Sequence, residues 1–116
     1  MTTYLTNTFS PAMLQEESQA IVNPLYYPTG LNEVKYVFEN DFDTFRKVSA
    51  ISHEVTAVVL STLLGFPIPF NRFNLSLSRG DVVYCLIPNF RAIFAREFTK
   101  EEIENAGIRI FRIAIN

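Results

Sequence analysis

Apolar residues recur with a helical period near the middle of the chain. After Ser52 they fall at spacings of i, i+3, i+4 and i+8: Val55, Val58, Val59 and Leu63. Ser52 is a favourable N-cap, Gly65 suits the left-handed position that follows a helix, and two prolines soon after it prevent continuation. The pattern therefore predicts a helix that ends at Gly65 and carries His53 in its first turn.

Two stretches after this helix have the patterns of strands. Apolar and polar residues alternate from Phe70 to Ser78, which places Phe73, Leu75 and Leu77 on one side and Arg72 and Asn74 on the other. The run Val82 to Ile87 is apolar throughout, as in a central strand that is covered on both faces. The turn Arg79-Gly80-Asp81 would join the two as a hairpin.

The remaining elements follow from shorter signals. The residue types predict a strand at Thr3 to Thr6, a short helix after Ser10, an extended piece at Ala20 to Tyr27, a helix at Leu31 to Asn40, a loop at Phe90 to Phe98, a helix opened by a capping box at Thr99 and a strand at Ile108 to Ile115. Thr44 to Ile51 has no clear period and is either a strand or an approach to the helix that carries His53. Alternating helices and strands favour an α/β fold, with a mixed β-sheet flanked by helices in a single domain over residues 1–116.

Composition and charge narrow the classes of function. The net charge of −2 argues against general attraction to duplex nucleic acid, so a nucleotide ligand would be small and held locally. The one cysteine, Cys85, excludes an internal disulfide and is compatible with a reducing cytosol. We see no signal peptide and no apolar run long enough to span a membrane. We therefore expect a cytoplasmic protein, in the host cytoplasm if a virus encodes it.

The candidate chemistry gathers around His53. Histidine is the usual acid or base near neutral pH, and the start of a helix attracts anions. Arg72 and Arg91 stand where phosphate clamps are commonly built. Three residues near the N-terminus offer neutral hydrogen-bonding groups: Asn7, Thr8 and Ser10. The simpler interpretations are a surface or capping histidine, solvated arginines and plain helix capping. Motifs for zinc, for a phosphate loop or for metal-dependent hydrolysis are missing, so no metal is expected.

Two blocks of the sequence form a recognisable pattern. They are L-T-N-T-F-S-P-A-M-L (Leu5 to Leu14) and the stretch Ser49 to Asp81, with S-A-I-S-H-E-V-T-A-V-V-L, I-P-F-N-R and G-D. These blocks resemble the viral and plasmid ring nuclease family, whose members act as type III anti-CRISPR proteins. The resemblance implies a homodimer that binds cyclic tetra-adenylate and cuts it without metal or cofactor into linear di-adenylates with cyclic 2′,3′-phosphate ends. It implies that His53 is the general acid.

The same resemblance gives roles to other residues and also shows a departure. Arg91 matches the family arginine that stabilises phosphate charge, Arg72 the arginine of the N-R pair, and Asn7 and Ser10 polar positions of the ligand cavity. The family motif R-L-P-E-G reads Arg91-Ala92-Ile93-Phe94-Ala95 here, so an aromatic residue suited to stacking on adenine replaces the glutamate. Three hypotheses stay open: a ring nuclease, a non-catalytic sponge or regulator that binds the cyclic nucleotide, and an interaction protein without a nucleotide ligand.

Overall fold

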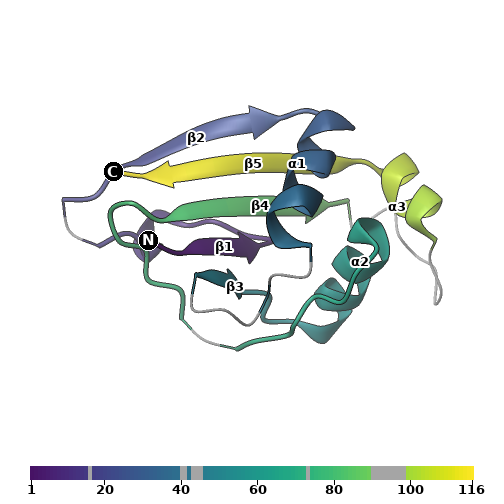
Figure 1. Ribbon diagram of the computed structural model, residues 1–116, viewed down its shortest axis with the longest axis horizontal. Coiled ribbons are helices and arrows are strands. Elements are labelled where there is room, and N and C mark those ends of the chain that lie inside the picture. The colour runs from purple at the N-terminus through teal and green to yellow at the C-terminus, as the bar shows by residue number, and fades with distance from the viewer. Residues whose placement is uncertain (16, 40–41, 43–45, 73, 90–98) are drawn as a thin grey trace.

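Strand β4 (Val82–Pro88) lies in the middle of a five-stranded sheet, as its unbroken apolar run predicts. The computed structural model describes residues 1–15, 17–39, 42, 46–72, 74–89 and 99–116. The other strands are β1 (Thr3–Thr6), β2 (Ala20–Leu25), β3 (Lys47–Ser49) and β5 (Ile108–Ile115). The strand order is β2-β5-β4-β1-β3 (Figure 1). β1 runs parallel to β3 and β4, and β5 runs antiparallel to β4 and β2, so the predicted mixed sheet is confirmed.

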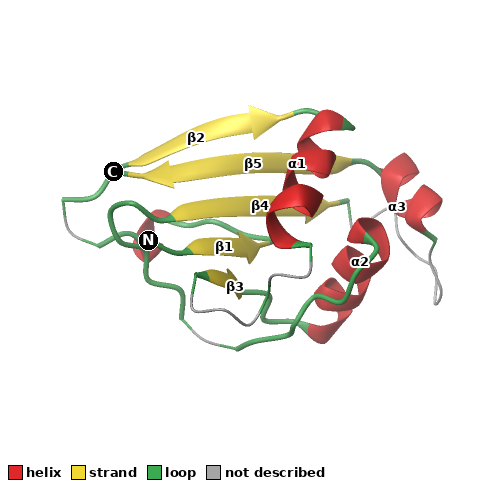
Figure 2. Cartoon of the chain, in the orientation of Figure 1, coloured by secondary structure: helices red, strands yellow, loops and turns green. Residues whose placement is uncertain are grey.

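The helices are drawn in red in Figure 2, and several begin or end at residues suited to capping a helix. They are α1 (Thr29–Phe38), α2 (Glu54–Leu64), α3 (Lys100–Ala106) and a short 3-10 helix, η1 (Pro11–Met13). The Thr99 hydroxyl accepts a hydrogen bond from the Glu102 N–H at 3.1 Å, which confirms the predicted cap of α3. Gly65 closes α2 with a φ of 82°, in the left-handed region that glycine adopts without strain. α1 begins at Thr29, two residues before the predicted Leu31.

The sheet separates two apolar cores. On one face, α1, α2 and α3 pack their buried side chains against the sheet, with Leu5, Tyr84, Leu86 and Ile110 beneath them. On the opposite face the covering layer is thinner: η1 and the segment around Leu77 pack over Val83, Cys85 and Ile113. Figure 1 shows α1 in front of the sheet, and Figure 2 shows the coil of η1 behind it. Burial in this second core raises the pKa of the Cys85 thiol to about 11.

The predicted hairpin of Phe70 to Ser78 with Val82 to Ile87 is wrong. In the described part of Phe70 to Ser78 the chain is extended but forms only one isolated bridge, between Leu77 and Leu14. β4 pairs instead with β1 and β5. The alternation itself has a physical basis, since Leu77 is buried while Asn74 and Ser76 are exposed. Alternating residues therefore reveal which side of a segment faces the core, but not which strand it pairs with.

The apolar face of α2 also differs from the prediction. The side chains of Val55 and Val58 are 68% and 50% exposed, so they do not share the buried face of Val59 and Leu63. The buried face of α2 is completed by other residues: Thr56, Ala57, Leu60 and Leu64. α2 thus exposes two valines in its first two turns.

The turn before β4 is held by a buried carboxylate. Asp81 accepts hydrogen bonds from the Thr2 and Ser78 N–H groups, both at 2.9 Å, so its side chain serves the fold. We expect Asp81→Ala to lower the free energy of unfolding by about 2–4 kcal/mol, because two N–H groups lose a charged acceptor. Asp81→Asn should cost less, since it keeps one acceptor oxygen. Equal denaturation midpoints for the wild type and Asp81→Ala would contradict this assignment.

Candidate ligand-binding site

A polar groove lies at the carboxyl ends of the parallel strands β1 and β3. It consists of two adjoining hollows that share Ser52 and Asn74. The first, of about 580 Å³, is lined by Ser52, His53, Arg72 and Asn74. The second, of about 480 Å³, is lined by Thr6, Thr8, Ser10, Ala12, Met13, Ala50, Ser52, Asn74 and Leu75. Ligands of α/β proteins commonly bind at this edge of the sheet, because the loops that follow parallel strands converge there.

His53 is the N-cap residue of α2 and not, as predicted, part of its first turn. Its backbone is extended, with φ −120° and ψ 131°, and the helix itself begins at Glu54. The His53 carbonyl accepts the hydrogen bond of the Ala57 N–H at 3.0 Å, while the imidazole forms no capping bond. The predicted N-cap, Ser52, precedes it and lines both hollows. The exposed imidazole is therefore available to a ligand in the groove.

The segment before Arg72 is fastened to the end of β3. The Asn71 N–H donates to the Ile51 carbonyl, and its side-chain amide donates to the Ser49 carbonyl, both at 2.8 Å. The Ser49 hydroxyl donates to the Pro69 carbonyl at 2.6 Å. These bonds bring Arg72, nineteen positions after His53 in the sequence, to the same hollow.

The guanidinium of Arg72 is free to bind an anion. It lies 5.3 Å from the centre of the Phe70 ring, a cation–π arrangement that holds the side chain without neutralising its charge. No carboxylate among the described residues pairs with it. An unpaired cation beside an exposed imidazole suits a ligand that carries phosphate.

The structure places the predicted neutral polar residues differently relative to the groove. Ser10 lines the second hollow, although its hydroxyl also accepts a hydrogen bond from the Ala12 N–H at 3.3 Å as the cap of η1. Asn7 lines neither hollow, whereas its neighbours Thr6 and Thr8 do. Binding and capping are thus compatible at Ser10.

Arg91 and Phe94 lie outside the residues that the structure describes. The chain leaves β4 at Pro88, and β4 runs parallel to β1, so its carboxyl end is at the same edge of the sheet as the groove. Among the described residues, no group of three histidine, cysteine or acidic side chains lies close enough together to hold a metal ion.

None of the described helices is long and apolar enough to cross a membrane.

Sequence reasoning did not assign Asn74 and Thr6 to the site, but it did name Thr8 as a candidate neutral donor, and Thr8 lines the second hollow. Asn74 was visible only as a polar position in an alternating segment, and Thr6 as the end of a strand. The Thr6 hydroxyl donates to the Thr8 carbonyl at 3.1 Å and orders the turn that follows β1. A stronger signal was the concentration of small polar residues directly after the predicted strand Thr3 to Thr6.

The fold and the groove together define a small α/β protein with one mixed sheet and a polar, cation-bearing groove at its parallel strand ends. The chain belongs to the STIV B116-like family, whose model matches residues 3–110.

Two relatives support this assignment. B116 of Sulfolobus turreted icosahedral virus has the same fold, with a TM-score of 0.79 and 20% identity over 98% of this chain and 99% of that one. "Uncharacterized protein 26" of Sulfolobus islandicus filamentous virus (isolate Iceland/Hveragerdi) is 33% identical over 82 residues. That match covers 70% of this chain and 66% of the relative, a little less than two thirds of its length. Both are viral proteins, which supports a viral origin for this chain.

Proposed function

We propose that the protein is a metal-independent ring nuclease that binds and cleaves cyclic oligoadenylate, with cyclic tetra-adenylate as the preferred ring. The observation that carries the proposal is the meeting of His53 and Arg72 in one polar groove. A proton donor and an unpaired cation are what cleavage of a phosphodiester by its own 2′-hydroxyl requires from a protein. The resemblance of the residues around His53 to ring nucleases adds the substrate. Cleavage would switch off type III CRISPR signalling.

In the proposed reaction the ligand supplies its own nucleophile. The ribose 2′-oxygen bonds to the adjacent phosphorus, the bond from phosphorus to the 5′-oxygen breaks, and His53 protonates the departing 5′-oxygen. The proton of the 2′-hydroxyl passes to solvent, and the product carries a cyclic 2′,3′-phosphate. Arg72 and Arg91 stabilise the phosphate charge, Ser10 binds a polar group of the ligand, and Phe94 stacks on an adenine. Because the nucleophile is already beside the phosphorus, positioning supplies much of the acceleration.

The second candidate function is a sponge or regulator that binds the cyclic nucleotide without cutting it. The observation that favours it is Phe94, which stands where the ring nuclease motif has a glutamate. The two functions differ in single-turnover conditions: an enzyme converts the ring when protein exceeds ligand, whereas a sponge returns it intact.

We further propose that the active form is a homodimer in the host cytoplasm. A cyclic ligand with internal symmetry is matched best by two copies of one site about a two-fold axis. The exposed Val55 and Val58, two and five positions after His53, offer apolar surface near the groove. Light scattering at tens of micromolar protein, with and without ligand, should give twice the chain mass. A monomer under both conditions would exclude the dimer.

Arg72 provides a test of the groove that does not depend on catalysis. We expect Arg72→Gln to weaken binding of cyclic tetra-adenylate about 10-fold, because a charge-assisted contact to phosphate is lost while the anchoring by Asn71 remains. Arg79→Gln is the matched control, since Arg79 donates to the Glu17 carbonyl and lines neither hollow. Calorimetric titration measures both. Equal affinity of the two variants would remove Arg72 from the site.

A further inference from the structure

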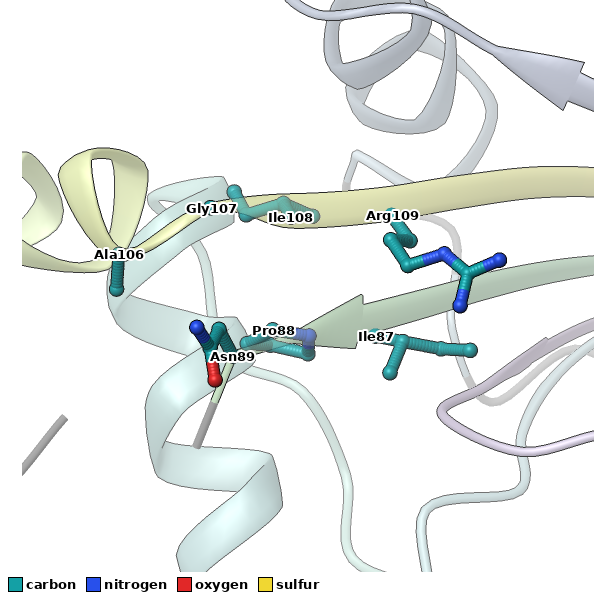
Figure 3. Close-up of a pocket in the computed structure, with 7 residues that line it drawn as sticks. All are labelled: Ile87, Pro88, Asn89, Ala106, Gly107, Ile108 and Arg109. Atoms are coloured by element: carbon teal, nitrogen blue, oxygen red, sulfur yellow. The ribbon is translucent and has the colours of Figure 1, made fainter. Parts of the chain in front are cut away.

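The face of the sheet that the α-helices leave open has a second, separate pocket. Its larger part, of about 590 Å³, is lined by Ile87, Pro88, Asn89, Ala106, Gly107, Ile108 and Arg109 (Figure 3). A smaller part, of about 260 Å³, is lined by Pro24, Leu25, Tyr26, Tyr27, Ile108, Arg109, Ile110 and Phe111. The two parts share Ile108 and Arg109, so we treat them as one Arg109 pocket. No lining residue belongs also to the polar groove.

Arg109 is the cation of this pocket, and no acidic side chain of the described residues pairs with it. Its cross-strand partner is Ile87, and Figure 3 shows its side chain reaching from β5 toward that residue on β4. The guanidinium lies 5.3 Å from the centre of the Phe111 ring, a contact that steadies it. Within the described part of the chain, nothing accepts a hydrogen bond from it. The described part of the chain offers it no ion pair, and no carboxylate lines either part of the pocket.

The walls of the larger part are mostly apolar, and aromatic residues border the smaller part. Ile87 and Phe111 form the floor on the sheet, and Tyr26 and Tyr27 border the smaller part. The Asn89 N–H donates to the Gly107 carbonyl at 2.9 Å and joins the ends of β4 and β5 beside the pocket. The larger part falls within the range of about 300–1,000 Å³ that small-molecule sites occupy. One unpaired cation among apolar walls selects a ligand with an anionic group and a flat apolar body.

We propose that the Arg109 pocket is a second binding site, which takes a mononucleotide-class ligand. The phosphate binds the fork of the Arg109 guanidinium, which presents its donors in the geometry that phosphate oxygens accept. The base lies against the apolar and aromatic wall, where stacking and burial favour a flat ring. The proposal is independent of catalysis at His53, because the two sites share no residue.

The test is a titration of the ¹⁵N-labelled protein with adenosine 5′-monophosphate, adenosine and inorganic phosphate at one ionic strength, followed by NMR. We expect adenosine monophosphate to shift the amide signals of Gly107, Ile108 and Phe111 saturably, and to bind more tightly than adenosine or phosphate alone. Shifts confined to Ser52 and Asn74, or phosphate binding as tightly as the nucleotide, would overturn the proposal.

Charge variants complete the test. Arg109→Gln should weaken the nucleotide about 10-fold. Arg79→Gln, which changes the net charge equally, should leave its affinity unchanged. Should Arg109→Gln fail to fold, Asn89→Asp places a negative charge at an exposed residue of the same pocket and should also weaken binding. Wild-type affinity in the folded variants of this pocket would contradict the assignment.

Discussion

Replacing His53 by alanine is expected to slow cleavage of cyclic tetra-adenylate by roughly 10²- to 10⁴-fold, the range for loss of a positioned general acid. Ligand affinity should stay nearly unchanged, because His53 acts on the departing oxygen and the groove keeps Arg72, Ser52 and Asn74. Single-turnover rates and equilibrium binding, measured on the same preparations, separate the two effects.

Thr62→Ala is the matched control for this variant. Thr62 lies in the last turns of the same helix, and its hydroxyl only donates to the Val58 carbonyl at 3.0 Å. It should cleave at the wild-type rate. If the His53 variant keeps the wild-type single-turnover rate, His53 is not the acid.

The second large effect concerns stability. Phe38, the last residue of α1, has a fully buried side chain. The centre of its ring lies 5.1 Å from that of Phe42, in a stacked arrangement, and 5.8 Å from that of Tyr84, in an edge-on arrangement. Phe38→Ala should lower the free energy of unfolding by about 3–5 kcal/mol, since it removes a large buried side chain and leaves a cavity.

Tyr36, on the same helix, is the control for Phe38 because its side chain is 87% exposed. Tyr36→Ala should change stability by less than about 0.5 kcal/mol. Chemical denaturation of the two variants measures both values. A loss below 1 kcal/mol for Phe38→Ala would mean that the helical layer contributes little to this fold.

The elements that local chemistry defines were predictable from the sequence. The apolar run of β4, the cap at Thr99 and the left-handed Gly65 all occur as expected. The pairing of the strands was not predictable from the sequence, because it depends on contacts between segments that are distant along the chain. Asn71 forms hydrogen bonds with backbone groups near the end of β3, and Leu77 forms a β-bridge with Leu14. The described residues between these two anchors therefore do not pair with β4. Single residue types carry no signal for such contacts.

The candidate site likewise contains residues that were predictable from the sequence and residues whose role depends on the fold. His53 and Arg72 were predictable as separate candidates, and the structure brings them to one hollow. Thr6 and Asn74 were not assigned, because their role follows from where β1 ends and how the segment after α2 returns. Arg91 and Phe94 lie outside the described residues, so their roles rest on the ring nuclease motif.

Strand β2, which forms one edge of the sheet, limits how two copies of the chain can associate. Gln19 and Asn116 exchange backbone hydrogen bonds of 2.7 and 2.8 Å, so every second residue of β2 from Ala20 directs its backbone outward. Pro24 falls on such a position and has no N–H to offer. Proline at an edge opposes extension of the sheet by another strand. The proposed dimer is therefore expected to form through side chains rather than through β2.

Incubation with cyclic tri-, tetra- and hexa-adenylate in excess chelator, followed by chromatography of the products, tests the proposed activity most directly. The protein in excess over ligand should convert the tetra-adenylate ring to linear di-adenylates with cyclic 2′,3′-phosphate ends. Quantitative recovery of all three intact rings from protein that binds them would contradict the ring nuclease and favour the sponge.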